Sequence, residues 1–185
     1  MHISLKQHGF TLLEVLIAFM ILSFGLLGAV ALQAKAKQAS FDSMQRAAAV
    51  ELASDIMHRI RSNDATNITT LYDVDFNSTE DVQANTTCYT QRCNAETLAK
   101  TDIANWRQAI RARENTGSLD NAVVCINPTS VAGDTSGVNV QVIVTWRGRQ
   151  AMTALANNPA GDCGTVDDRR RAVVMDTFVL IRSEP

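Results

Sequence analysis

The order of apolar and polar positions divides the chain into a long apolar segment near the N-terminus and a mixed remainder. From Val15 to Ala34, 20 residues pass without a charged side chain, and only Ser23 and Gln33 are clearly polar. A helix of that length reaches roughly across the 30 Å hydrocarbon core of a bilayer. A run that is apolar on every face is rare in a small soluble domain. The pattern therefore predicts a membrane-spanning segment over residues 10–34.

Past Lys35 the pattern becomes amphipathic without losing its helical spacing. Apolar residues recur every three or four positions, and charged residues occupy other faces. No proline interrupts the stretch from Phe10 to Arg61, so one helix is expected over it, with residues 35–62 as its amphipathic half. The polar segment Ser62 to Ile68 ends the helix. The apolar positions are Phe41, Met44, Ala48, Leu52, Ile56 and Ile60, and the charged ones are Arg46, Glu51, Asp55, Arg59 and Arg61.

Residues 63–185 are expected to form a globular head. The segment from Leu71 to Ala95 is rich in Asn, Thr and Asp, which predicts a surface loop region with at most short structure. A second helix is predicted from Ala95 to Asn115, and Gly117 supplies its stop signal. Its apolar residues lie near one face: Leu98, Ile103, Trp106 and Ile110. Trp106 is most simply a core residue.

After this helix the period changes to that of strands. Short or alternating apolar runs predict strands at Ala122 to Ile126, Val138 to Trp146 and Ala172 to Ile181. Turn chemistry at Asn127-Pro128 and Gly133 to Gly137 separates the first two strands, and a loop from Asn157 to Asp168 precedes the last. The middle strand alternates strictly, which predicts that one of its faces is buried. The fold class is therefore α+β, a long helix packed on a small antiparallel sheet of about three strands.

Four cysteines follow the apolar segment. An even number in a domain that a membrane helix would export predicts two disulfides in an oxidising compartment. Four cysteines allow three pairings. A local Cys88–Cys93 bridge with a Cys125–Cys163 bridge is preferred, because Cys125 ends one predicted strand and Cys163 lies in the loop before another.

No catalytic, cofactor or metal site is predicted. The only histidines are His2, His8 and His58, so the head lacks the base of a Ser-His-Asp triad and the usual ligands of zinc. The glycine-flanked segment from Gly133 to Gly137 lacks the lysine of a phosphate-binding loop. The net charge of −2 argues against a nucleic-acid partner.

The start of the apolar segment carries the most informative motif. A short leader containing Lys6 ends at Gly9, followed by Phe10, and the only charge between Phe10 and Lys35 is Glu14. The apolar run is too long for an ordinary secretory signal peptide. An uncleaved anchor fits Lys6 on the cytoplasmic side. An unpaired carboxylate is costly at the head of a membrane segment, so Glu14 requires a partner.

This motif resembles the class III signal of type IV prepilins and pseudopilins. The resemblance implies that residues 1–9 are a leader, that a membrane-embedded prepilin peptidase cuts after Gly9, and that the new amino group of Phe10 is methylated. Glu14 of one subunit would then pair with the Phe10 amine of a neighbour. A simpler alternative is a capping box, in which Thr11 and Glu14 close the first helical turn. The two roles are compatible at different stages of assembly.

Within this superfamily the chain is most similar to the PilV family of minor pilins. The similarity implies a low-abundance subunit that helps to start or cap a type IV pilus and supports adhesion and twitching motility. Its partners would be other minor and major pilins, prepilin peptidase, the inner-membrane assembly platform and, before assembly, membrane lipid. A minor pseudopilin of the type II secretion system is the alternative within the superfamily. An uncleaved binding protein anchored in the inner membrane is the alternative of another class. The similarity rests on Phe10 to Ile21, Ala47 to Arg61, the Trp106 helix followed by a cysteine strand, and Val142 to Arg147.

Overall fold

A computed structural model describes residues 9–63, 65–81, 83, 87–133, 136–152 and 161–181. The predicted leader up to residue 8 and residues 157–160 of the predicted last loop lie outside this part. The chain divides into two units, Met1–Phe41 and Asp42–Pro185. Each unit is described by itself.

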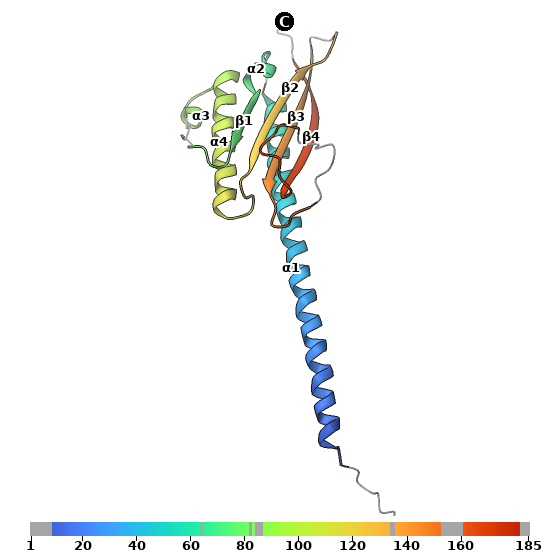
Figure 1. The fold of residues 1–185 in the computed structure, drawn as a ribbon. Helices are drawn as coiled ribbons and strands as arrows, with labels where there is room; N and C mark the ends of the chain where they lie inside the picture. The colour runs from blue at the N-terminus through green and yellow to red at the C-terminus, as the bar shows by residue number, and fades with distance from the viewer. Residues whose placement is uncertain are drawn as a thin grey trace, which may run out of the picture. The chain divides into compact units, whose positions relative to one another are not determined.

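Helix α1, Leu12–Ser62, is the longest element and runs through both units (Figure 1). Its bounds agree with the prediction to within two residues. In the first unit every described residue except Gln38 and Phe41 is exposed. The apolar side chains of this stretch therefore lie on all faces of a helix without covering one another.

In the second unit one stripe of α1 is buried. Three of the apolar positions in the predicted amphipathic half, Leu52, Ile56 and Ile60, are 2%, 0% and 0% exposed. Met44 belongs to the same set of apolar positions but is 56% exposed. At about 100° per residue, sixteen steps place Met44 roughly 160° around the helix from Ile60. The buried stripe consists of Gln45, Ala49, Leu52, Ala53, Ile56 and Ile60.

A four-stranded antiparallel sheet forms the other layer of the head, in the order β1-β2-β3-β4. The fold is thus α+β, with α1 packed on the sheet. Helix α4, Ala95–Asn115, has the predicted bounds, and the Asn94 side chain caps its start by accepting from Thr97 N at 2.8 Å. The other elements are α2 (Ile68–Leu71), β1 (Val74–Asn77), α3 (Thr87–Thr90), β2 (Val123–Ser130), β3 (Gly137–Arg147) and β4 (Arg170–Leu180).

Strand β1 was not predicted, and it adds a fourth strand within the expected loop region. It pairs with β2 from Val74↔Ile126 to Asn77↔Val123. The prediction of a turn at Asn127-Pro128 was also wrong, because β2 continues to Ser130. A proline is tolerated there because β1 begins at Val74, opposite Ile126, which leaves the β1 side of β2 unpaired at Pro128.

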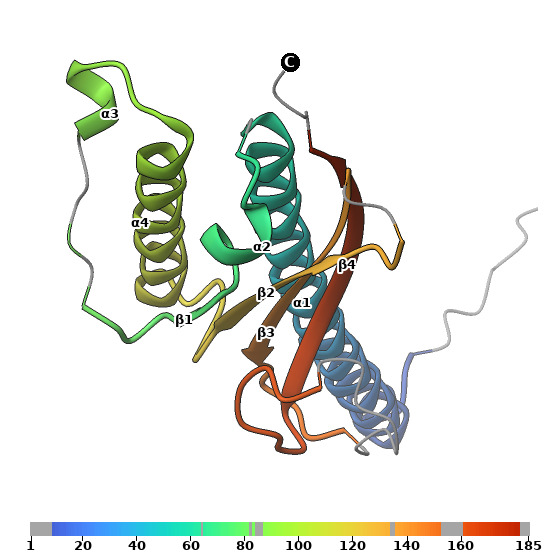
Figure 2. The same cartoon turned by 90° about the horizontal axis from the view of Figure 1, so that it is seen from above.

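The main core lies between the sheet, α1 and α4. Trp106 is 1% exposed, as expected of a core residue, and it shares one cluster with Leu52 and Ile56 of α1 and Val124 and Val142 of the sheet. Figure 2 shows α4 and the end of α1 as neighbouring helices. Burial of this aliphatic and aromatic surface is the main stabilising contribution in the head.

The opposite face of the sheet is covered over part of its length. The alternation of β3 predicted one buried face, yet Ile143 and Thr145 on the other face are 5% and 0% exposed. They are covered because Cys163 joins Cys125 and Ile143 in a second cluster. A disulfide thus provides the apolar cover that a further helix would supply in a larger domain.

Candidate functional site

The predicted cleavage site lies ahead of α1 in exposed chain. Gly9 and Phe10 are outside any helix or strand, and Phe10 is 84% exposed. A side chain added at Gly9 would meet no atom within 4 Å. Exposed segments outside regular structure are the preferred substrates of proteases. The bond between Gly9 and Phe10 is therefore open to a peptidase.

Thr11 caps the first turn of α1. Its Oγ1 accepts a hydrogen bond from Glu14 N at 3.2 Å, and its carbonyl oxygen accepts from Val15 N at 3.3 Å. This is the first half of the capping box considered above. The second half is not formed: within the described part of the chain the Glu14 carboxylate accepts no hydrogen bond and makes no ion pair. The cap leaves this carboxylate available to a partner.

Glu14 borders an open, mostly apolar concavity on one side of α1. Phe10 contributes to the same concavity, so the two residues predicted to pair between subunits border one surface. A carboxylate in the first turn is favoured by the helix dipole, but the apolar surroundings give it little solvation once water is excluded. The residues that line the concavity are Phe10, Glu14, Val15, Ala18, Phe19 and Leu22.

The rest of this helix half matches the composition of a membrane segment. In the part searched, α1 is the one helix long and apolar enough to cross a membrane, judged by length and composition alone. Its Ser23 hydroxyl donates to Phe19 O at 2.7 Å, which satisfies a polar group inside the helix itself. A Cβ added at Gly25 or Gly28 would meet no other part of the described chain within 4 Å, so nothing in that part requires a glycine at either position.

The four cysteines form the preferred pairs. Cys88–Cys93 closes a short loop beside α4, and Cys125–Cys163 joins β2 to the segment before β4. Cys88 is further held by α4, because its sulfur lies 3.2 Å from Thr101 Oγ1. Both bridges lie in the head, so the cysteine residues and the Gly9–Glu14 motif belong to different units.

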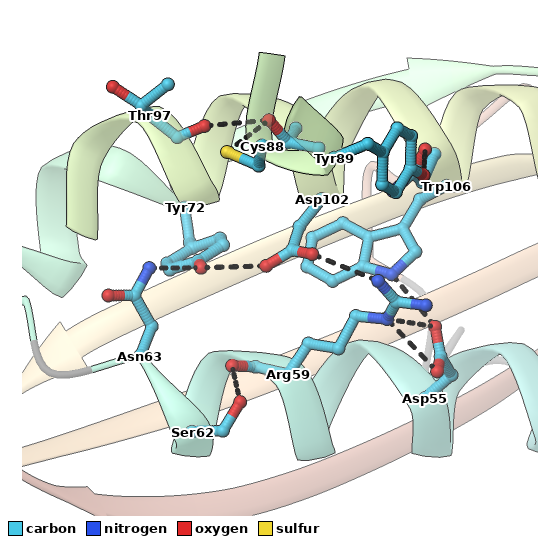
Figure 3. A network of polar contacts seen from close by, with 12 residues as sticks. Asp55, Arg59, Ser62, Asn63, Tyr72, Cys88, Tyr89, Thr97, Asp102 and Trp106 are labelled. Atoms are coloured by element: carbon cyan, nitrogen blue, oxygen red, sulfur yellow. Dashed lines mark hydrogen bonds and ion pairs between the residues drawn. The ribbon is translucent and has the colours of Figure 1, made fainter. Parts of the chain in front are cut away.

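A polar network joins α1 to α4 inside the head (Figure 3). Arg59 of α1 bonds Asp55 through Nε at 3.1 Å and Asp102 of α4 through Nη1 at 3.1 Å. Trp106 Nε1 donates to Asp55 Oδ2 at 3.0 Å. Asp55 and Arg59 lie off the apolar stripe of α1, as predicted, and both remain partly exposed while they bond to α4 across the helix pair.

The network continues to Tyr72. Asn63 Nδ2 donates to the Tyr72 hydroxyl oxygen at 2.7 Å, and that hydroxyl lies 3.5 Å from Asp102 Oδ2. Burial raises the pKa of Tyr72 to about 12. Burial also raises the pKa of Asp102, against the opposing effect of the Arg59 hydrogen bond. For Arg59, burial acts against the charged form, but the bonds to Asp102 and Asp55 outweigh it and raise the pKa.

Each of these shifts follows from burial together with the hydrogen bonds and charges of the network. Each polar group in the network is held by a neighbour that orients one helix on another. In the searched residues no group of three or more His, Cys, Asp or Glu side chains is arranged to hold a metal ion. The network could have been found from the i,i+4 pair Asp55–Arg59 and the i,i+4 pair Asp102–Trp106, but the sequence does not show that the two pairs face each other.

Two family models match the chain. The prokaryotic N-terminal methylation motif matches residues 4–30, and the type IV pilin Tt1218 family matches residues 31–104. No curated protein and no solved structure matches significantly. Together with the long helix on an antiparallel sheet, the two matches support the type IV pilin superfamily for this chain. A pilin or pseudopilin role is structural rather than catalytic, and it involves prepilin peptidase and assembly with other pilins.

Proposed function

We propose that this chain is a minor pilin of a type IV pilus, of the PilV kind. In this proposal residues 1–9 are a leader removed after Gly9, residues 10–34 span the inner membrane and later enter the fibre core, and residues 63–185 form a periplasmic or surface-exposed head. The amphipathic half, residues 35–62, joins the two. The subunit takes part in starting or capping the fibre and so supports twitching motility and adhesion.

One observation carries the proposal: the Glu14 carboxylate has no partner in the described chain, and Glu14 borders an open apolar concavity that Phe10 also lines. Cleavage after Gly9 turns the Phe10 amide nitrogen into a cationic amine. A carboxylate in a desolvated site is stabilised by such a cation, and an unpaired one costs several kcal/mol, on the order of the penalty for a buried ion. The amine of a neighbouring subunit therefore provides the missing partner and couples processing to assembly.

The first test is intact-mass and N-terminal analysis of the protein from cells with and without prepilin peptidase. The expected result is a chain that starts at methylated Phe10 only when the peptidase is present. An uncut chain starting at Met1 in both strains would sink the pilin proposal and favour an uncleaved binding protein in the inner membrane.

A second experiment addresses the role of Glu14. Glu14→Gln keeps the size and helix position but removes the charge, so we expect normal processing and loss of the subunit from sheared fibres by at least about tenfold, as expected for loss of a buried ion pair. Asp42→Asn is the control, because Asp42 also lies on α1 but in the second unit. Normal incorporation of the Glu14 variant would contradict the pairing. Recovery of the wild-type chain with a secretion apparatus instead of sheared pili would identify a pseudopilin.

A further inference from the structure

The two edges of the sheet differ in how they are protected. Strand β1 forms one edge and is 4 residues long, whereas β4 forms the other and is 11 residues long. Figure 2 shows β4 on the side of the sheet away from β1. Natural edge strands are usually kept from pairing by short length, charge, proline or a bulge. Strand β4 pairs with β3 in unbroken register, and from Ala172 to Ile181 its only charged residue is Asp176.

The hydrogen bonds at the two ends of β4 show which backbone groups face outward. Ile181 N donates to Ser136 O at 2.7 Å, and Gly148 N donates to Arg169 O at 2.8 Å. Because bonded and non-bonded residues alternate in an antiparallel ladder, the odd-numbered residues of β4 bond to β3. The even-numbered residues point their N–H and C=O groups to the open edge. These residues are Ala172, Val174, Asp176, Phe178 and Leu180.

The outward backbone groups of these five residues bond to no other part of the described chain. Arg170, by contrast, is hydrogen-bonded within the chain. Its backbone N–H donates to Asp167 O, and its guanidinium donates to Thr165 O and Asn121 O. The unprotected edge thus begins after Arg170 and runs to the end of the strand. A row of unpaired donors and acceptors along extended chain is a template for one more strand.

The side chains of the even-numbered residues of β4 determine which sequence an added strand would need. Ala172 and Val174 pack on the cluster around the Cys125–Cys163 bridge. Farther along the strand, Phe178 is 47% exposed and Leu180 is 68% exposed. Asp176 lies between these apolar pairs, exposed and bonded by Gln141 Nε2 at 3.0 Å. Along this face of β4 the five outward positions are therefore two apolar residues, one acidic residue and two more apolar residues.

We propose that the β4 edge binds an extended segment of a different polypeptide as an additional strand, and that this segment carries a basic residue opposite Asp176 with apolar residues on either side. Backbone hydrogen bonds supply affinity, and the alternate side chains supply selectivity. An opposite charge directly across a strand pair stabilises it, and apolar partners would cover Phe178 and Leu180.

A second copy of this chain fits the edge less well. A symmetric antiparallel pair that uses all five outward residues places Asp176 directly opposite itself, and like charges there destabilise the pair. Shifting the register avoids the contact only by leaving outward groups unpaired. The proposal goes beyond assembly through the N-terminal helix and does not depend on cleavage after Gly9.

The test uses the full-length chain in detergent micelles and a fluorescent peptide long enough to span Ala172 to Leu180. The peptide alternates valine and threonine and has lysine at its centre, on the valine face. We expect it to bind. We expect its twin with N-methylated amides on the edge-facing side to bind at least about tenfold more weakly, because several backbone hydrogen bonds to the edge are lost. Equal binding of the two peptides, or no binding of either, overturns the proposal.

Two variants of the chain sharpen the test. Val174→Pro removes an outward N–H without removing a bond to β3, and should weaken binding about tenfold. Asp176→Lys should reverse the preference, so that a peptide with glutamate at its centre binds better than the lysine peptide. Asp168→Lys, a charge change in an exposed loop, is the control. Tryptophan fluorescence of each variant confirms the fold.

Analytical ultracentrifugation tests whether a second copy of this chain occupies the β4 edge instead. A dimer that Val174→Pro converts to monomer, with no peptide binding, would overturn the proposal in favour of a second copy. Since no step of this test involves prepilin peptidase, its failure leaves the minor-pilin proposal as it stands, and an unprocessed chain leaves the edge proposal as it stands.

Discussion

The two halves of α1 use similar residues in opposite ways. In the first unit Leu22 and Leu27 are 56% and 66% exposed, whereas in the second unit Leu52 and Ile56 are 2% and 0% exposed. Full burial of such a side chain is worth about 1.5 to 3 kcal/mol. The head obtains this stabilisation within its own chain. The described residues of the first half do not, so their apolar surface is open to lipid or to another protein.

Polar residues follow the same division. In the head half, Asp55 and Arg59 bond across to α4 and fix the helix pair. In the first half, residues 10–34, Glu14 is the one charged residue, and its carboxylate makes no hydrogen bond or ion pair within the described chain. The comparison shows that Asp55 and Arg59 find their partners within the chain, whereas the Glu14 carboxylate finds none in its described part.

Matched leucine substitutions test this contrast most directly. Leu52→Ala should lower the free energy of unfolding of the head by about 3 to 5 kcal/mol, because it leaves a cavity in the core. Leu27→Ala should leave it unchanged. Both tryptophans, Trp106 and Trp146, lie in the head, so their fluorescence during denaturation in detergent reports the head alone. An equal loss in both variants would show that the two halves are not independent.

Removing each disulfide compares two parts of the head. Replacing Cys125 and Cys163 by Ala should cost about 4 kcal/mol, and replacing Cys88 and Cys93 about 2 kcal/mol, because the loop closed by the first pair is longer. The sequence separations are 38 and 5 residues. Denaturant titration of the two double variants measures the difference. If the short loop proves the more important, loop entropy is not the main contribution of these bridges.

Alkaline pH should destabilise the head through Tyr72. Its pKa is raised to about 12 from an ordinary value of 10.0. The folded state therefore holds its proton after the unfolded chain has lost it, and stability falls as the pH rises from 10 to 12, by about 2 to 3 kcal/mol. Tyr72→Phe should remove that pH dependence. Tyr89→Phe is the control, since Tyr89 is 68% exposed, and denaturant titrations at several pH values provide the measurement. The same slope in the Tyr72 variant would assign the effect elsewhere.

Features set by residues close together in the sequence were predicted correctly, whereas features set by residues far apart in the sequence were missed. Helix α4 was predictable because its apolar spacing and its stop at Gly117 are local signals. The Gly9-to-Glu14 motif was readable for the same reason. Strand β1 was not, because four residues are too few to show a period, and it exists through pairing such as Phe76↔Val124.

The interactions that the sequence did not reveal are long-range ones. Arg59 and Asp102 lie 43 residues apart in sequence, and no local pattern relates them. The open edge of β4 likewise follows from the strand order, which places β4 outermost. The fold class could therefore be predicted from short-range patterns, and the Gly9-to-Glu14 motif could be recognised by resemblance, whereas the helix–helix network and the open edge of β4 required the structure.

The smallest predicted effect compares the two helix caps. Asn94→Ala removes the bond from Thr97 N at 2.8 Å and should lower the stability of the head by about 1 kcal/mol. Thr11→Ala removes the equivalent bond from Glu14 N at 3.2 Å, but no change is expected in the unfolding of the head. Its effect should be confined to faster amide hydrogen exchange in the first turn of α1. If Thr11→Ala instead lowered the stability of the head, the first turn of α1 would be coupled to a core whose buried helix residues begin at Gln45, and the division of α1 into two independent halves would fail.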